Sequence, residues 1–304
     1  MRIKLPCKRC RLAMIPYLLL VFWLNVFAGV SLADTDQAIF WAIEKDGEPA
    51  GYLLGTIHSE DPRVLEFSEE FLGKLRNNDM FAMEMVPDLP TLARLTEYMH
   101  YPKGQTLESV VGAERFNALV NALAVYKVPR DFVTGMKPWA AMMTLSTPPP
   151  ETGFFMDLSL SLRASGSGLK VIGLETLEQQ LAFLEEMPMA MQLSLLDQAI
   201  AESGRVKDAH DQMVDAYLEN NLVQLQALSE EEFQTIGSEE RDYFFQAGIL
   251  NRNQHMLETL LPQLEGNSIF VAVGALHLPG EGGLLDLLRR GGYVLKPQDM
   301  PFVN

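Results

Sequence analysis

Two histidines in this sequence close the same short motif, Gly-x-x-His, at residues 55–58 and 274–277. Each motif follows an apolar run that is typical of a buried strand. The glycine lets the backbone turn sharply and approach a ligand closely. We therefore expect His58 and His277 just past the carboxyl ends of core strands, where open α/β sheets carry their ligand sites.

Glu84 is the third candidate site residue. It directly follows the apolar run at residues 80–83, at the end of a predicted strand. A carboxylate there is exposed at the mouth of the strand, paired, or bound to a cation, since burying it alone is costly. Two imidazoles and one carboxylate suit a divalent ion with open coordination positions. We take His58, Glu84 and His277 as candidate metal ligands, although the Gly-x-x-His spacing alone does not require a metal.

Other catalytic motifs are missing from the sequence. It contains no compact His-Glu-x-x-His, no Gly-x-Ser-x-Gly elbow, no P-loop and no dinucleotide-binding fingerprint. The remaining histidines, His100, His210 and His255, lie at a helix end, on a mixed helical face or off an apolar stripe. We interpret these three as surface or structural residues. The missing motifs disfavour a serine hydrolase and a nucleotide-dependent enzyme.

Strand and helix signals place the candidate residues in an α/β fold. Five apolar runs have the length and flanking residues of strands: 39–43, 51–54, 80–83, 169–174 and 268–273. The first two are joined by a hairpin signal, Asp46-Gly47. We expect a mixed or parallel sheet core, a large helical section at about 188–265, and a loop or lid at the three prolines 148–150.

The first 33 residues have the pattern of a secretory signal peptide. Five basic residues and no acid lie among the first eleven, an apolar run follows, and Ser31 and Ala33 are small residues at the −3 and −1 positions of a cleavage site. The alternative is an uncleaved membrane anchor, because about 18 apolar residues can span a bilayer. Pro16 and Asn25 interrupt the run and favour cleavage. Both interpretations predict export, to the periplasm or the medium, or anchoring by the N-terminal segment.

The rest of the chain, residues 34–304, is expected to form an acidic α/β domain. Both cysteines, Cys7 and Cys10, lie in the leader, so this domain has no disulfide and no thiolate metal site. Without the leader there are 19 basic and 40 acidic residues, a net charge of −21. Such a charge repels phosphate backbones, so we expect no nucleic-acid partner, and contact with a membrane only through an uncleaved leader.

Several motifs resemble, in order along the chain, those of the TraB/PrgY/GumN family, which includes the Tiki proteases. They are LLGTIH at 53–58, the strand-end Glu84, GLET at 173–176, Arg252-Asn253, VGALHLPGEGGL at 273–284 and RRGGY at 289–293. The resemblance covers about residues 39–296. It implies a fold related to the erythromycin-esterase and ChaN-like α/β folds, with both Gly-x-x-His units and the glutamate forming the active site.

The resemblance also implies a metal-dependent hydrolase with peptidase-like activity, because Tiki proteins are divalent-metal-dependent proteases. Manganese or cobalt is the implied ion, and zinc is also compatible. An acidified water would attack a carbonyl of a peptide or small-molecule substrate. Arg252 is then the candidate for stabilising the oxyanion, and Asn253 for orienting a ligand. Asp157 and Glu175 are candidates for fixing imidazole orientation, although a helix-start role fits Glu175 equally well.

Two other functions fit the same residues. Some relatives are thought to sequester a peptide signal, and a ChaN-like protein binds haem iron, so a non-catalytic peptide- or ligand-sequestering protein is one alternative. The second is a metal-free hydrolase, similar to erythromycin esterases, in which histidine and glutamate activate water.

Overall fold

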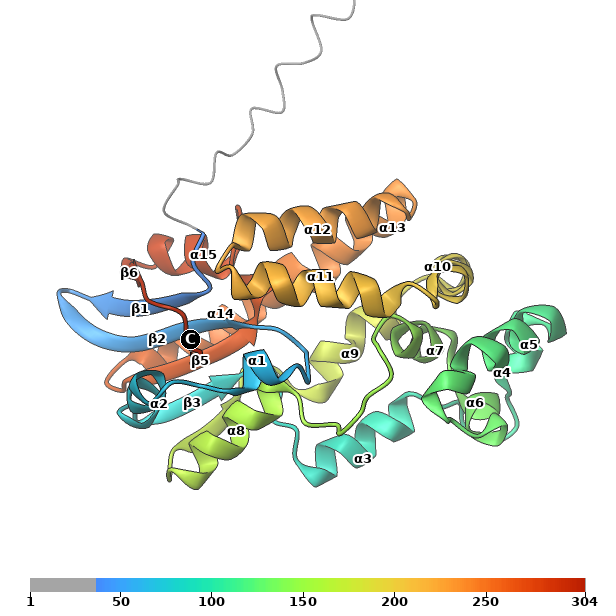
Figure 1. Ribbon diagram of the computed structural model, residues 1–304, viewed down its shortest axis with the longest axis horizontal. Helices are drawn as coiled ribbons and strands as arrows, with labels where there is room; N and C mark the ends of the chain where they lie inside the picture. The colour runs from blue at the N-terminus through green and yellow to red at the C-terminus, as the bar shows by residue number, and fades with distance from the viewer. Residues whose placement is uncertain (1–36, 304) are drawn as a thin grey trace, which may run out of the picture. The chain divides into compact units, whose positions relative to one another are not determined.

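A six-stranded mixed sheet, in the order β4-β3-β5-β2-β1-β6, is the centre of the fold (Figure 1). A computed structural model describes residues 37–303, so the predicted signal peptide at 1–33 lies outside the described residues. The strands are β1 (Phe40–Lys45), β2 (Glu48–Thr56), β3 (Met80–Met83), β4 (Lys170–Gly173), β5 (Ile269–Gly274) and β6 (Tyr293–Pro297). The four strands β2, β5, β3 and β4 are parallel, whereas β1 is antiparallel to both β2 and β6.

The two strands at the end of the sheet, β1 and β6, differ in how well the sequence predicts them. The β1–β2 hairpin turns at Asp46 and Gly47, whose φ angles of 53° and 86° are those that a tight hairpin turn of this kind requires. The edge strand β6 was not among the predicted strands. Its alternation of buried and exposed side chains is short, and it ends in Lys296 and Pro297, which are typical of a protected sheet edge.

Aromatic side chains fill one face of the sheet around Phe270. Its ring lies 5.9 Å from Phe40, 6.0 Å from Tyr52 and 6.1 Å from Phe81, centroid to centroid. Phe71 from α2 packs edge-on against it at 5.5 Å. Such contacts add to the burial energy of each ring, so this face fixes the register of β1, β2, β3 and β5.

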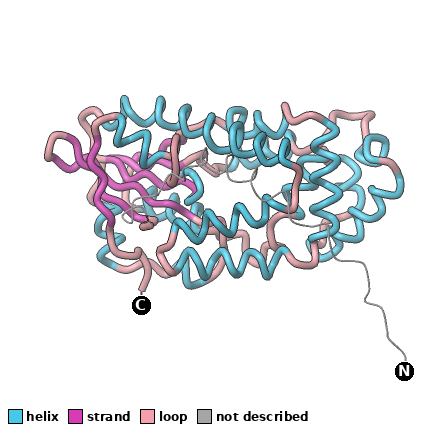
Figure 2. Tube along the Cα trace, turned by 90° about the horizontal axis from the view of Figure 1, so that it is seen from above, coloured by secondary structure: helices cyan, strands magenta, loops and turns pink. Residues whose placement is uncertain are grey.

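Helices cover the sheet and also form a region without strands (Figure 2). The α-helices are α1 (Pro62–Leu65), α2 (Glu69–Arg76), α3 (Leu89–Tyr98), α4 (Leu107–Val111), α5 (Ala113–Ala122), α6 (Arg130–Gly135), α7 (Pro138–Leu145), α8 (Met156–Gly166), α9 (Leu177–Glu185), α10 (Met189–Glu202), α11 (Val206–Leu218), α12 (Leu222–Gln234), α13 (Ser238–Tyr243), α14 (Asn251–Leu264) and α15 (Leu284–Arg290). Two 3-10 helices are η1 (Leu123–Tyr126) and η3 (Ala275–His277), and η2 (Phe244–Leu250) is a π-helix.

The buried apolar residues form two clusters. The sheet cluster joins the strands to α2, α8, α11, α12, α14 and α15, and the helical cluster is built from α4 to α7, α9 and α10. The helical section expected at about 188–265 is therefore five α-helices and a π-helix that belong to both clusters. Among residues 37–303 we find no helix with the length and apolar character needed to cross a membrane.

Candidate active site

Each of the four parallel strands delivers one ionisable side chain to the same edge of the sheet. His58 follows β2, His277 follows β5, Glu84 follows β3 and Glu175 follows β4. In the parallel register, Thr56 of β2 pairs with Gly274 of β5. The carboxyl ends of parallel strands share one edge, which is where ligands bind in open α/β sheets.

The glycines of the two Gly-x-x-His motifs leave room for close packing at the strand ends. A Cβ atom at Gly55 would lie 2.9 Å from the Cα atom of Ala275, in the other turn. A Cβ atom at Gly274 would lie 3.2 Å from the Glu84 Oε1 atom. The backbone N–H of Gly274 instead donates a 2.7 Å hydrogen bond to this oxygen. The absence of a side chain at Gly55 lets the two turns touch, and its absence at Gly274 lets the Glu84 carboxylate approach the backbone N–H group.

His277 is buried and its ring orientation is set by Asn253. The side chain is only 5% exposed, and its Nδ1 atom lies 2.6 Å from Asn253 Oδ1. The amide nitrogen of Asn253 donates to the carbonyl oxygens of Gly282, at 2.9 Å, and of His277, at 3.3 Å. Because the amide oxygen only accepts, the proton of a neutral ring lies on Nδ1, and Nε2 keeps a free lone pair.

The free Nε2 atom of His277 faces Glu84 Oε1 at 3.8 Å. Burial lowers the pKa of His277 to about 4, although the Glu84 charge opposes this. Burial would raise the pKa of Glu84, but the charge that His277 carries once it is protonated in acid, the charge of Arg252 and the Gly274 hydrogen bond outweigh it and bring this pKa down to about 2. At neutral pH the pair is therefore a neutral imidazole beside an ionised carboxylate.

Arg252 connects Glu84 to Glu175. Its Nη2 atom lies 2.5 Å from an oxygen of each carboxylate, and its Nε atom donates to Glu175 Oε2 at 3.0 Å. Burial raises the pKa of Glu175, although the hydrogen bonds from Arg252 oppose the rise. One guanidinium thus faces two carboxylates, which leaves surplus negative charge in a buried site when both are ionised.

The π-helix η2 orients Arg252 and Asn253. It runs from Phe244 to Leu250 and continues directly into α14, so the extra residue per turn rotates the next residues relative to a regular helix. From the sequence, Asn253 is expected on the apolar stripe of one regular helix. The π-helix has no clear sequence signal, since it depends on how α9, α14 and the turn at His277 pack together.

Gln180 is a site residue that the sequence analysis missed. Its Nε2 atom donates to Glu84 Oε2 at 3.2 Å. The predicted capping box is present, because Thr176 and Gln179 bond each other's backbone N–H groups at the start of α9. This cap starts the helix right after Glu175, and Gln180 in its first turn therefore points back to the sheet edge.

His58 lies in a more open environment. Its side chain is 62% exposed, and its Nδ1 atom is 3.5 Å from Asp157 Oδ2. The other oxygen of Asp157 accepts a 2.6 Å hydrogen bond from Thr56. The ring stacks on Phe155 with 3.9 Å between centroids, and the His58 carbonyl oxygen lies 3.2 Å from His210 Nε2. Phe155 was not predicted as a site residue.

The seven predicted site residues therefore form two groups. Five of them are linked by direct contacts: Glu84, Glu175, Arg252, Asn253 and His277. The other two, His58 and Asp157, form a separate pair. A neutral imidazole, an ionised carboxylate and surplus negative charge fit the donor chemistry of a divalent cation. In the described part of the chain, however, no three His, Cys, Asp or Glu side chains are placed to hold one ion together.

Comparison with known proteins gives three distant relatives. Metalloprotease TIKI1 of Xenopus tropicalis is 24% identical over 310 residues, an alignment that covers 84% of this chain and 61% of TIKI1. The uncharacterized protein YbaP of Shigella flexneri is 25% identical, with 80% of this chain and 89% of YbaP covered. YbaP of Escherichia coli (strain K12) is 26% identical, with 78% and 87% covered.

The chain thus spans less than two thirds of TIKI1 but most of YbaP. No solved structure matches the chain. The sequence profile of the TraB/PrgY/gumN family matches residues 39–297, which include all six strands and all the candidate site residues. The chain therefore belongs to the TraB/PrgY/gumN family.

Proposed function

We propose that this protein is an exported, divalent-metal-dependent hydrolase that acts on peptide or peptide-like substrates. One observation supports this most directly: the unprotonated Nε2 atom of His277 lies 3.8 Å from the ionised carboxylate of Glu84 in a buried site. The distant similarity to a protein named as a metalloprotease agrees with it. The fold is proposed to be of the erythromycin-esterase and ChaN-like kind.

In this proposal His277 and Glu84 would hold the ion, and the exposed His58, which lies beside Asp157 outside this pair, would have to turn toward them to become the third ligand. When bound, a divalent ion lowers the pKa of a coordinated water and polarises a carbonyl. Asn253 keeps His277 in the tautomer that leaves Nε2 free, whereas Asp157 lies 3.5 Å from the Nδ1 atom of His58 and is proposed to orient that ring when the ion binds. Manganese, cobalt and zinc are the ions to test.

Arg252 is proposed to position Glu84 and to balance charge, instead of stabilising an oxyanion. Its Nη2 and Nε atoms already bind Glu84 and Glu175, and its Nη1 atom lies 3.5 Å from the carbonyl oxygen of Gly248. A guanidinium held in this way fixes the carboxylate that faces His277. Glu175 then holds Arg252 in place.

The test measures metal content and peptide cleavage together. The purified protein is analysed for bound metal, then incubated with a peptide library and each of the three ions, and the products are identified by mass spectrometry. We expect about one ion per chain and cleavage that His277→Ala abolishes. His100→Ala is the matched control, because it also removes a histidine but lies outside the site, and it should keep full activity.

Two results would contradict the metal-dependent hydrolase. Tight peptide binding without products, unchanged in His277→Ala, would indicate a sequestering protein. Hydrolysis by a metal-free preparation would indicate water activation by histidine and glutamate alone. Export is tested separately, by N-terminal mass spectrometry of the mature protein, which should begin at Asp34.

A further inference from the structure

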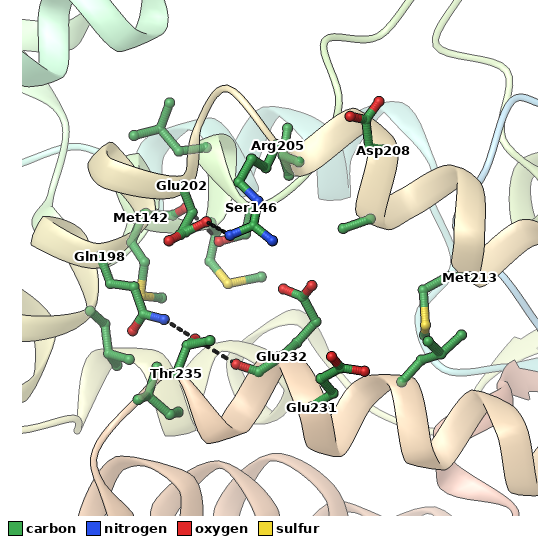
Figure 3. Close-up of a pocket in the computed structure, with 18 of the residues that line it drawn as sticks. Met142, Ser146, Gln198, Glu202, Arg205, Asp208, Met213, Glu231, Glu232 and Thr235 are labelled. Atoms are coloured by element: carbon green, nitrogen blue, oxygen red, sulfur yellow. Dashed lines mark hydrogen bonds and ion pairs between the residues drawn. The ribbon is translucent and has the colours of Figure 1, made fainter.

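A cavity of about 590 Å³ lies between α7, α10, α11 and α12 (Figure 3). We call it the α11 cavity. None of its lining residues belongs to the candidate active site. Its volume lies within the range of about 300–1,000 Å³ that is common for ligand pockets.

The α11 cavity lies where the two hydrophobic clusters meet. Met142 and Leu195 on one side belong to the helical cluster, and Met213 and Leu228 on the other side pack against the sheet cluster. The space between packed helices is one of the places where ligand sites preferentially form. Methionine side chains also adapt to ligands of different shape.

The walls of the α11 cavity are strongly acidic. Four acids, Glu202, Asp208, Glu231 and Glu232, line it together with one basic residue, Arg205, for a formal net charge of −3. Arg205 Nη1 already pairs with Glu202 at 3.0 Å. Figure 3 shows the Glu232 side chain extending from α12 into the space below α11. An apolar lining between carboxylates is complementary to a ligand that is both apolar and basic.

Two elements connect the α11 cavity to the turn that carries His58. The first is α11, from which Asp208, Ala209, Gln212 and Met213 line the cavity. On the same helix, the His210 ring lies 3.2 Å from the carbonyl oxygen of His58, and the buried hydroxyl of Tyr217 donates to the carbonyl oxygen of Gly55 at 2.7 Å.

The second connection is the loop between α7 and α8. It leaves the cavity at Ser146 and ends at Phe155, which stacks on the His58 ring. The Glu60 carboxylate holds this loop, because it accepts hydrogen bonds from the backbone N–H groups of residues 151–153. Helix α11 and the loop between α7 and α8 therefore each contact both the cavity and the turn that carries His58.

We propose that the α11 cavity binds the basic, apolar part of a peptide whose neighbouring residues reach His58. The favoured sequence alternates Lys or Arg with Leu, Met or Phe, so that apolar side chains enter the cavity and basic ones pair with Glu231 and Glu232. This inference names the substrate class of the proposed hydrolase and rests on it for cleavage, but peptide binding is separate from turnover.

The test is fluorescence anisotropy of a labelled eight-residue peptide of alternating Lys and Leu, titrated with the full chain in the presence of chelator. We expect saturable binding that weakens as salt rises, and no binding of the matching Glu and Leu peptide. Glu231→Lys/Glu232→Lys should raise the Kd about tenfold or more. Glu258→Lys/Glu265→Lys, which makes the same charge change at exposed positions on and just after α14, should change it less than twofold.

Equal weakening by both double variants would overturn the proposal, because it would show attraction to net charge alone. If the lysine variant does not fold, as judged by circular dichroism, Glu231→Gln/Glu232→Gln replaces it with a smaller expected loss. The experiment separates the two proposals. Binding through the cavity without any cleavage would contradict the hydrolase only, and cleavage without preference for basic residues would contradict the cavity assignment only.

Discussion

The two Gly-x-x-His turns share a sequence pattern and lie on adjacent parallel strands, yet they place their histidines in opposite environments. The His277 side chain is 5% exposed and is fixed by Asn253, whereas the His58 side chain is 62% exposed and rests on Phe155. A strand-end motif therefore determines where the backbone turns. The helices that pack over that turn decide whether its histidine is buried.

This contrast divides the candidate site into a fixed half and an open half. The fixed half is the network of His277, Glu84, Arg252 and Glu175, in which each polar side chain has a partner. The open half is His58 with Asp157, beside the loop that leads to the α11 cavity. We expect the fixed half to tolerate substitution poorly, and the open half to be where a substrate makes contact.

The largest effect is expected from removing the two histidines in turn. His277→Ala should reduce kcat/KM by about 10³-fold or more, because it removes both the free Nε2 atom and the partner of Glu84. His58→Ala should reduce it by about 10- to 100-fold. Steady-state peptide cleavage checks both values. Equal losses would show that the two halves do not differ in function.

The next effect compares a buried ion network with an exposed one. Arg252→Met should lower the free energy of unfolding by about 3–5 kcal/mol, because it leaves two carboxylates buried without their counter-charge. Arg63 pairs with Asp61 and Asp215 at the surface, so Arg63→Met should cost less than about 1 kcal/mol. Urea denaturation measures both variants. A cost below 1 kcal/mol for Arg252→Met would contradict the network described here.

Acid should destabilise the fixed half. The folded-state pKa of His277, about 4, lies below the usual 6.5, so the unfolded chain binds more protons between these values. Stability should therefore fall by about 3 kcal/mol as pH drops from 6.5 to 4. Below pH 4.5 the Glu84 contribution is also lost, since its folded-state pKa is about 2.

His277→Gln tests this pH dependence, because glutamine keeps a polar side chain but does not titrate. Its free energy of unfolding should change by about 3 kcal/mol less than that of the wild type between pH 6.5 and 4. Denaturant titrations at several pH values supply the comparison. The same pH dependence in both proteins would show that His277 is not the group responsible.

The smallest expected effect distinguishes the two glycines. Gly55→Ala should cost about 2 kcal/mol, because its Cβ atom would meet the backbone of Ala275 at 2.9 Å and the two strand ends would have to separate. Gly274→Ala meets a carboxylate oxygen at 3.2 Å, and a side chain moves more easily. We therefore expect Gly274→Ala to lower the free energy of unfolding by less than about 1 kcal/mol. Its peptide cleavage should also fall, because the new methyl group displaces Glu84. Thermal unfolding measures the stability of both variants, and peptide cleavage assays measure their activity.

Much of the fold was predictable because its signals are local. The five predicted strands are present, the Asp46-Gly47 hairpin forms, and the capping box at Thr176 starts α9. The strand β6 was missed because five residues at a sheet edge carry too little apolar periodicity. The breaks near Gly204, Asn220-Asn221 and Gly237 can be predicted from the sequence and separate α10, α11, α12 and α13, whereas the π-helix η2 was missed, since packing against neighbouring elements sets it.

The sequence by itself determined which residue types stand at the four parallel strand ends, and the glycines that let two turns touch. Only the tertiary structure decided which of these residues meet. Glu84 and His277 are far apart in the chain, and the pairing of β3 with β5 brings them together, while the packing of α14 adds Arg252. Burial and charge depend on such neighbours, so identical motifs yield one buried, neutral histidine and one open to solvent.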